Sequence, residues 1–312
     1  MRITRSHLLT CLVLFLIISG CSDTDSPTDA GTGDEVEDPV PVHFEDANLE
    51  GAIRDALPFP GDTIYEHQVR TLTELDASRR GITDLTGIEA LSGLTDLILL
   101  RNEIEDLSPL SVLHQLELID VRQNQVADLT PLAGLTALQQ LYFGNNQVRD
   151  VTPLAALDGL QGLNLSANPI EDYEPLAALR DLRNLVAVAS GMTEIGWMAQ
   201  LTQLEYLVVV RTPLEDIGPL AGLTELNTVL LPWNAISDVG PLASLPLLKE
   251  VDLDANAVDD ISPLVANVGL GSGDVVFLRD NPLQADGVCE DVAALVERGV
   301  DLRYDEGQLG CD

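Results

Sequence analysis

The amino-acid sequence predicts an α/β solenoid, a row of short coils with a parallel β-sheet on its concave face and short helical or 3-10 turns on its convex face. The first observation behind this prediction is the pattern LxxLxLxxNxIxDLxPL, which is complete over residues 94–110 and returns every 22 residues. The second is that the leucine columns keep one register along most of the chain. A unit this short buries its leucines only against neighbouring copies, so such repeats stack into an array.

Residues 1–20 are typical of an export signal. Arg2 and Arg5 precede an apolar run that is too short to span a bilayer but suits a secretory signal. The run ends in the letters ISGC, which resemble a bacterial lipobox. The resemblance implies cleavage before Cys21 and lipidation of its sulfur, with acyl chains such as palmitate. It also implies sorting to the outer membrane, where the cell has one, because Ser22 follows rather than Asp. An ordinary signal peptide with a chance cysteine is the alternative.

Residues 21–40 are predicted to form an acidic tether. The segment has many acidic residues, no basic residue and few apolar groups, so it buries too little surface to offset the entropy cost of ordering. An interaction tail is the alternative. The whole chain has 16 Lys and Arg against 51 Asp and Glu, a formal net charge of −35. This charge argues against binding to nucleic acid or to anionic headgroups, so we expect membrane contact through the lipid anchor only.

The repeats follow an anchor column that is mostly asparagine. Its members are Asn102, Asn124, Asn146, Asn168, Ser190, Thr212, Asn234 and Asn256, with Arg80 before them and Asn281 after them. These residues resemble the leucine-rich repeat family, and DLxPL in the second half of the unit is similar to the internalin-like 22-residue type. The resemblance covers residues 72–283. It implies a leucine-rich repeat solenoid that recognises protein through its concave face.

Each part of the repeat has an expected structural role. LxxLxL is a short strand whose alternating apolar residues face the core, and the anchor Asn turns inward to bond backbone groups of the loop. A helical turn then begins at proline, which suits the first helical position because its missing N–H is not needed there. We expect the residue before that proline to cap the turn. These candidate caps are Ser108, Thr130, Thr152 and Ser262.

Both ends of the array need covers. Residues 41–71 contain an amphipathic helical pattern with Leu49, Ile53 and Leu57 on one face, which resembles the N-terminal cap of bacterial repeat proteins of this kind. Residues 284–312 predict a C-terminal cap, with a helix over 290–298 and a strand over 300–304. Cys289 and Cys311 lie in this segment, and in an exported protein such a pair favours a disulfide over a metal site.

One repeat column is acidic and leaves two interpretations open. Clustered carboxylates suit Ca²⁺, whereas an Asp in a turn also bonds backbone N–H groups of its own turn. The internalin-like pattern carries Asp at this position, which favours the second interpretation, so we predict no metal site. The column consists of Asp84, Asp106, Asp128, Asp150, Asp172, Glu194, Asp216, Asp238 and Asp260.

The outward positions of the strands are the candidate binding surface. In the middle of the array they become apolar and aromatic, with carboxylates on both sides, which is typical of a protein-binding surface. The alternatives are that β-branched residues merely suit strands, or that a second copy of the chain or the tether covers them. The candidate ligand-binding residues are Tyr142, Val186, Val188, Tyr206, Val208, Val210, Leu230 and Trp233.

The sequence offers little for catalysis. His43, His67 and His114 form no metal pair and have no Ser or Cys nucleophile beside them in the pattern, and there is no CxxC or Gly-rich phosphate loop. We therefore predict a non-enzymatic protein without a cofactor: a lipid-anchored, extracytoplasmic module that binds a protein partner. A structural scaffold or adhesion spacer is the alternative, and a glycan-binding protein with exposed aromatic residues is a weaker one.

Overall fold

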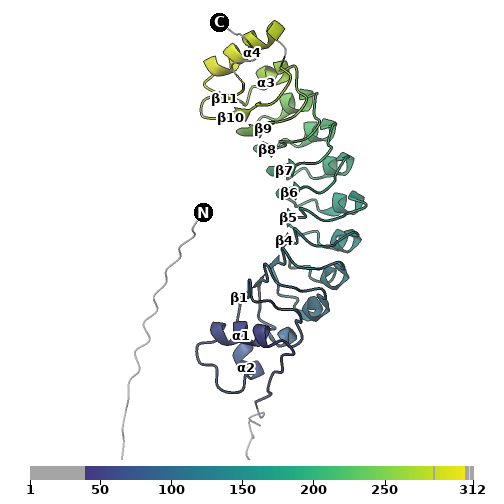
Figure 1. Ribbon diagram of the computed structural model, residues 1–312, viewed down its shortest axis with the longest axis vertical. Helices are drawn as coiled ribbons and strands as arrows, with labels where there is room; N and C mark the ends of the chain where they lie inside the picture. Colours follow the sequence, from purple (N-terminus) through teal and green to yellow (C-terminus); the bar gives the residue numbers. More distant parts are fainter. Residues whose placement is uncertain (1–38, 284, 306–308, 310–312) are drawn as a thin grey trace, which may run out of the picture. The chain divides into compact units, whose positions relative to one another are not determined.

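A computed structural model describes residues 39–283, 285–305 and 309, and it confirms the predicted solenoid. Within this part of the chain, eleven strands form one parallel sheet in sequence order, β1 to β11. Figure 1 shows the strands along the inner side of the repeat array and short helical turns along its outer side. No helix of the described residues is long and apolar enough to cross a membrane.

The strands are short and evenly spaced. Most have three residues, whereas β6 and β7 have five. Their bounds are β1 Glu74–Asp76, β2 Asp96–Ile98, β3 Leu118–Asp120, β4 Gln140–Tyr142, β5 Gly162–Asn164, β6 Asn184–Val188, β7 Tyr206–Val210, β8 Thr228–Leu230, β9 Glu250–Asp252, β10 Val275–Phe277 and β11 Asp301–Arg303.

The turns on the outer side are mostly 3-10 helices. They begin one residue before proline in most coils, as the fixed φ of proline favours. Their bounds are η1 Ile88–Ala90, η2 Ser108–Val112, η3 Thr130–Leu132, η4 Thr152–Ala156, η5 Glu174–Ala178, η6 Gly196–Gln200, η7 Gly218–Gly222 and η8 Gly240–Ser244; one turn, α3 Ser262–Ala266, is α-helical.

The anchor asparagines bond as predicted. Asn102 Nδ2 donates to the carbonyls of Ala77 and Leu99, both at 2.9 Å, and its Oδ1 accepts the N–H groups of Arg80 and Ile82 at 3.0 and 3.1 Å. One side chain therefore satisfies backbone groups of its own coil and of the coil before it. The leucine columns between these loops are buried, with Leu97 and Leu99 at 0% exposure.

The predicted capping of the turns is wrong. Ser108 and Thr130 are the first residues of η2 and η3, and no side chain caps these turns from the N-cap position. Instead the acidic column does so from two residues upstream: Asp106 Oδ1 accepts the N–H of Ser108 at 2.7 Å, and Asp128 Oδ1 accepts that of Thr130 at 2.8 Å. The same correction holds for Thr152 and Ser262, whose N–H groups go to Asp150 and Asp260.

Helices lie at both ends of the array. The helix predicted near the N-terminus is α1 Ala47–Ala56, which buries Leu49 and Ile53, and a short α2 Glu66–Val69 follows it. Asp46 caps α1 and also accepts the N–H of Thr83 at 2.8 Å, which joins α1 to the first coil. At the other end, α4 Ala285–Glu297 precedes β11, which extends the sheet beside β10.

Candidate ligand-binding face

The concave face carries rows of side chains that run across the strands. Register places Val186 of β6 beside Val208 of β7, and Val208 beside Leu230 of β8. A second row brings Val188 beside Val210. Strands in a sheet lie about 4.8 Å apart, so these side chains contact one another. The result is a continuous aliphatic surface over three neighbouring strands.

Most of the predicted residues of this surface are partly exposed, but Val208 is not. Its side chain is only 8% exposed, because Val186 and Leu230 flank it on both sides. Val208 therefore supports the surface from below and presents little of itself to a partner. We define the apolar patch by its partly or fully exposed residues: Val186, Val188, Tyr206, Val210, Leu230 and Trp233.

Trp233 is the most exposed residue of the patch, at 57%. It has a φ of 60°, and its N–H donates to the Asp254 carbonyl at 2.9 Å. The Arg211 guanidinium lies 5.6 Å from the centre of the indole ring, a cation–π distance. The contact orients the indole while leaving more than half of it in solvent.

Tyr142 lies apart from the patch. Asn164 separates it from Val186 in the strand register, and its neighbours are polar. Its hydroxyl donates to Gln140 Oε1 at 2.6 Å, and Arg122 lies 5.5 Å from the centre of its ring. Burial raises the pKa of the Tyr142 hydroxyl. The sequence grouped Tyr142 with the aliphatic residues, whereas the structure places it in a hydrogen-bonded polar cluster.

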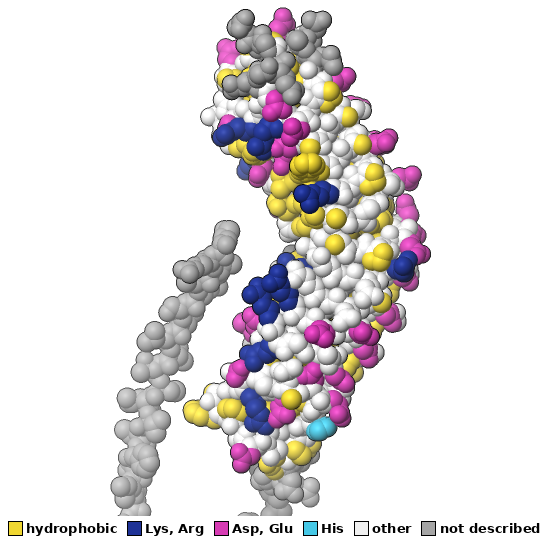
Figure 2. Space-filling model, viewed as in Figure 1, with side chains coloured by type: hydrophobic (Ala, Val, Ile, Leu, Met, Phe, Trp, Pro, Cys, Tyr) yellow, Lys and Arg dark blue, Asp and Glu magenta, His cyan; other side chains and the backbone are white. Residues whose placement is uncertain are grey.

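Charged residues of both signs lie on both sides of the patch. Toward β9, Glu250, Asp252 and Asp254 follow one another on alternate positions, and burial raises the pKa of Asp252. Arg279 pairs with Asp254 at 2.5 Å. Toward β1, arginines and carboxylates both occur, as in the Arg122–Asp120 ion pair. In Figure 2, yellow apolar side chains lie between two groups of dark blue basic side chains.

The arginines near β1 include two that sequence reasoning missed. Arg79 and Arg101 directly precede the anchor column and have φ values of 59° and 61°. In this left-handed conformation the chain turns sharply at the end of the strand, so simple alternation of strand residues does not predict where the side chain goes. Ten non-glycine residues, one in each coil from Arg79 to Asp280, share this conformation, and a 22-residue tally of that column would have found the pair.

A hollow of about 370 Å³ joins the arginines to the apolar patch. Its lining contains Arg79, Arg101 and Arg122 at one end and Val186 and Val188 at the other. Backbone and side chains of the intervening coils form its floor, among them Gly144, Asn145, Asn164 and Ser166. A ligand in this hollow would meet positive charge and aliphatic surface together.

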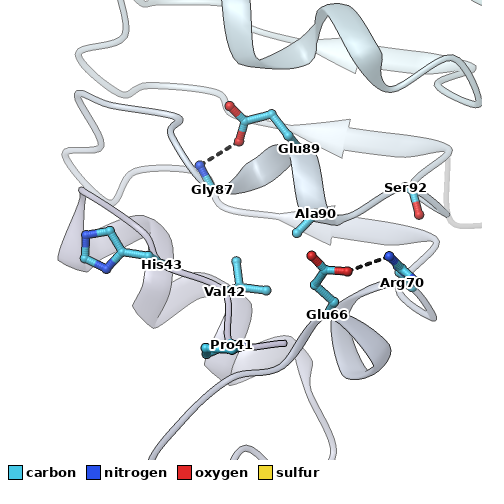
Figure 3. Close-up of a pocket in the computed structure, with 9 residues that line it drawn as sticks. All are labelled: Pro41, Val42, His43, Glu66, Arg70, Gly87, Glu89, Ala90 and Ser92. Carbon is cyan, nitrogen blue, oxygen red and sulfur yellow. Dashed lines mark hydrogen bonds and ion pairs between the residues drawn. The ribbon is translucent and has the colours of Figure 1, made fainter. Parts of the chain in front are cut away.

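A second hollow lies between the N-terminal segment and the first coil (Figure 3) and has a volume of about 390 Å³. Its charged groups are already paired: Glu66 with Arg70 at 2.5 Å, and Glu89 with the N–H of Gly87 at 2.7 Å. A Cβ on Gly87 would lie 2.4 Å from the His43 carbonyl oxygen, so glycine is needed for the two segments to approach this closely. These contacts explain how the segment packs, and they single out no ligand.

Every member of the acidic column except Glu194 accepts a backbone hydrogen bond in the described part of the chain. Besides Asp106 and Asp128, the carboxylates of Asp84, Asp150, Asp172, Asp216, Asp238 and Asp260 each accept the N–H two residues ahead, at 2.7–2.9 Å. Hydrogen bonds from the hydroxyl and N–H of Thr130 hold the pKa of Asp128 below its ordinary value. Within the described part of the chain, no three Asp, Glu, His or Cys side chains are placed to share a metal ion.

Two predicted sites fall outside the described residues. These are the lipidation site Cys21, with the signal and most of the tether, and Cys311. Cys289 is disulfide-bonded, and its pairing with Cys311 stays a prediction.

Comparison with known proteins agrees with this architecture. A family model described as Leucine Rich repeats (2 copies) matches residues 114–156. No curated protein sequence matches the chain. Among solved structures, internalin C2 from Listeria monocytogenes str. 4b F2365 is 31% identical, over 76% of this chain and 97% of internalin C2, with a TM-score of 0.57. The chain belongs to the internalin-like leucine-rich repeat family.

Two further structures share the fold. An internalin (inlF) from the same Listeria strain is 24% identical over 89% of this chain and 97% of its own, with a TM-score of 0.59. A leucine-rich repeat protein of Leptospira interrogans is 18% identical over 75% of this chain and 73% of its own, with a TM-score of 0.61. Leucine-rich repeat domains typically bind proteins and are generally non-catalytic scaffolds, which agrees with the surface described above.

Proposed function

We propose that this leucine-rich repeat protein is a non-catalytic binding module of the cell envelope that recognises a protein partner through the apolar patch. The observation that carries the proposal is the patch itself, an aliphatic surface across β6, β7 and β8 with Trp233 57% exposed at its edge. Exposed apolar surface of this kind, with charged residues around it, is the usual composition of a protein-binding site.

The chain would be held at the membrane by lipid on Cys21, in the outer membrane where the cell has one, and a C-terminal disulfide between Cys289 and Cys311 would close the last coil. The lipobox resemblance supports the anchor, and the bonded state of Cys289 supports the disulfide. Labelling cells with palmitate tests the anchor: the label should enter the chain and be lost in Cys21→Ser.

A pull-down from envelope and medium proteins tests the patch. The full chain serves as bait beside a variant with Trp233→Ser and Val188→Ser, both at partly or fully exposed positions, so the fold is preserved. The matched control carries Val112→Ser and Leu247→Ser, which removes exposed apolar groups outside the patch (55% and 46% exposed). We expect a protein captured by wild type and control but not by the patch variant. Equal capture by all three baits would rule out the patch.

A further inference from the structure

Two arginines at the end of the hollow nearest β1 have no acidic partner among the described residues. Eight arginines of the described chain form ion pairs with carboxylates, among them Arg122 with Asp120 at 2.5 Å. Arg79 and Arg101 form none with any described residue, although acidic residues outnumber basic ones about threefold in this chain. Arg101 donates Nε–H to Gln123 Oε1, a neutral partner that leaves its charge uncompensated.

The fold holds these two cations side by side. Arg79 and Arg101 occupy the same column in adjacent coils, and their N–H groups donate to the Leu100 and Arg122 carbonyls, both at 2.9 Å. This fixes both backbones in the left-handed conformation. Like charges in neighbouring coils repel each other, so an anion placed between them gains from both. Each guanidinium also offers N–H donors in a planar fork that matches a carboxylate.

We infer that Arg79 and Arg101 form a carboxylate subsite for acidic residues of an extended peptide segment, whose apolar residues then lie on the apolar patch. The inference rests on the proposed function and adds the charge and the order of the partner's residues. One hollow contains both ends of this site. Four strand spacings separate β2 from β6, roughly 19 Å, which an extended peptide crosses in about six residues.

A peptide fits the hollow better than other acidic polymers. Nucleic acid would need a broad basic surface, and the chain has a formal net charge of −35. An acidic glycan would place hydroxyl groups against Val186 and Val188, which cannot hydrogen-bond them. Leucine or valine side chains of a peptide lose no hydrogen bonds there.

Fluorescence anisotropy with two labelled peptides of identical composition tests the inference on the full chain. In the segregated peptide, a pair of glutamates precedes a short aliphatic run by about six residues. In the scrambled peptide these residues are intermixed. We expect the segregated peptide to bind more tightly, with an affinity that falls as salt is added. Binding of neither peptide up to about 1 mM, or of both equally, would overturn the inference.

The variant Arg79→Gln with Arg101→Gln should weaken binding of the segregated peptide by about tenfold and reduce its salt dependence. Arg149→Gln with Arg180→Gln makes the same change in net charge at exposed positions away from the hollow, and should bind like wild type. If both variants lose affinity equally, or neither does, there is no subsite.

Two further binding measurements distinguish a wrong carboxylate subsite from a wrong assignment of the ligand. The patch variant should lose affinity for the segregated peptide while keeping its salt dependence. If it does so and the Arg79→Gln, Arg101→Gln variant binds like wild type, the carboxylate subsite is wrong and the proposed function stands. If the patch variant binds the segregated peptide like wild type, the inferred placement of its apolar residues is wrong, and the pull-down decides the proposed function by itself. Oligogalacturonate that binds as tightly as the peptide, in a manner that depends on both arginines, would overturn the assignment to a peptide.

Discussion

Two stretches of the array differ in the hydrogen bonds that join one coil to the next. From Asn102 to Asn168 the anchor asparagines bond the loops of neighbouring coils, and each strand has three residues. At Ser190 and Thr212 the asparagine is missing, and β6 and β7 lengthen to five residues that pair as far as Val188 and Val210. Where the column of asparagine hydrogen bonds is interrupted, the backbone pairing between strands becomes longer.

The interrupted stretch also shows local substitutes for the missing anchor. The Tyr173 hydroxyl donates to the Ser190 carbonyl at 2.7 Å, and the Tyr173 ring stacks on Trp197 with centroids 6.2 Å apart. Gly191 takes a φ of 73° directly after Ser190. Ser190 follows β6 directly, so a coil that departs from the framework also contributes Val186 and Val188 to the apolar patch. In the β6 coil, the longer strand pairing and the Tyr173 bond take the place of the amide that Ser190 lacks.

The largest expected loss of stability comes from removing an anchor asparagine of the regular stretch. Asn146→Ala removes the bonds from Nδ2 to the Val121 and Phe143 carbonyls, at 2.9 and 2.8 Å, and the bond from the Val126 N–H to Oδ1, at 2.9 Å. These backbone groups are buried, so we expect a loss of about 3 kcal/mol in the free energy of unfolding. Urea denaturation followed by circular dichroism measures it.

Gln147→Ala is the matched control, because its side chain is exposed and only its backbone bonds the preceding coil. It should change the urea midpoint little. A cost for Asn146→Ala no larger than that of the control would mean that the strands alone hold the coils together.

Most of the fold could be predicted from the repeat, because the same residue types return at the same positions every 22 residues. Leucine columns predict the strands and the core, and the anchor asparagine predicts its own hydrogen bonds, since a buried amide must be satisfied. The caps were assigned to the wrong residue. The sequence also predicted that each Asp of the acidic column bonds backbone N–H groups of its own turn, and the bond from the Ser108 N–H to Asp106 confirms it. Both interpretations placed a cap at the same turn, and the sequence did not show that the Asp bond replaces the Ser cap.

The candidate site was less predictable, for a physical reason. Alternation along a strand places Val186 and Leu230 on the concave face, but it does not show that they cover Val208 from both sides. Nor does it apply to Arg79 and Arg101, which lie past the strand ends in the left-handed conformation. The exposure of a side chain on this sheet depends on its neighbours in the adjacent strands, which lie one repeat away in the sequence. Alternation along a single strand does not identify them.

A smaller effect is expected at the turns, where the two stretches differ again. Asp128 bonds the N–H of Thr130, whereas the Glu194 carboxylate accepts no hydrogen bond from the described part of the chain. Asp128→Ala should lower the free energy of unfolding by about 0.5–1 kcal/mol at neutral pH. Glu194→Ala should change it by no more than a few tenths of a kcal/mol. Equal losses would mean that the acidic column acts by charge rather than by capping.

The stabilisation by the Asp128 carboxylate should depend on pH, and the direction follows from its pKa. The pKa of Asp128 is lowered in the folded chain by the hydroxyl and N–H of Thr130. Its stabilisation is therefore complete above the unfolded pKa of about 3.9 and is lost as the pH falls through the lower, folded value. The gap between the unfolding midpoints of wild type and Asp128→Ala should close on acidification through this range. A gap that stays constant, or widens in acid, would contradict the assignment of the cap to the ionised carboxylate.

The smallest expected change in stability is at Ser190, where the anchor column lacks asparagine. Ser190 is 5% exposed, and its Oγ has no hydrogen-bond partner among the described residues. Ser190→Ala removes a buried hydroxyl that bonds nothing while keeping the Tyr173 bond, which goes to the backbone carbonyl. The free energy of unfolding should therefore stay the same or rise by no more than a few tenths of a kcal/mol. A clear loss would show that the hydroxyl holds a water in place of the missing asparagine, and that the column of hydrogen bonds continues through this coil in another form.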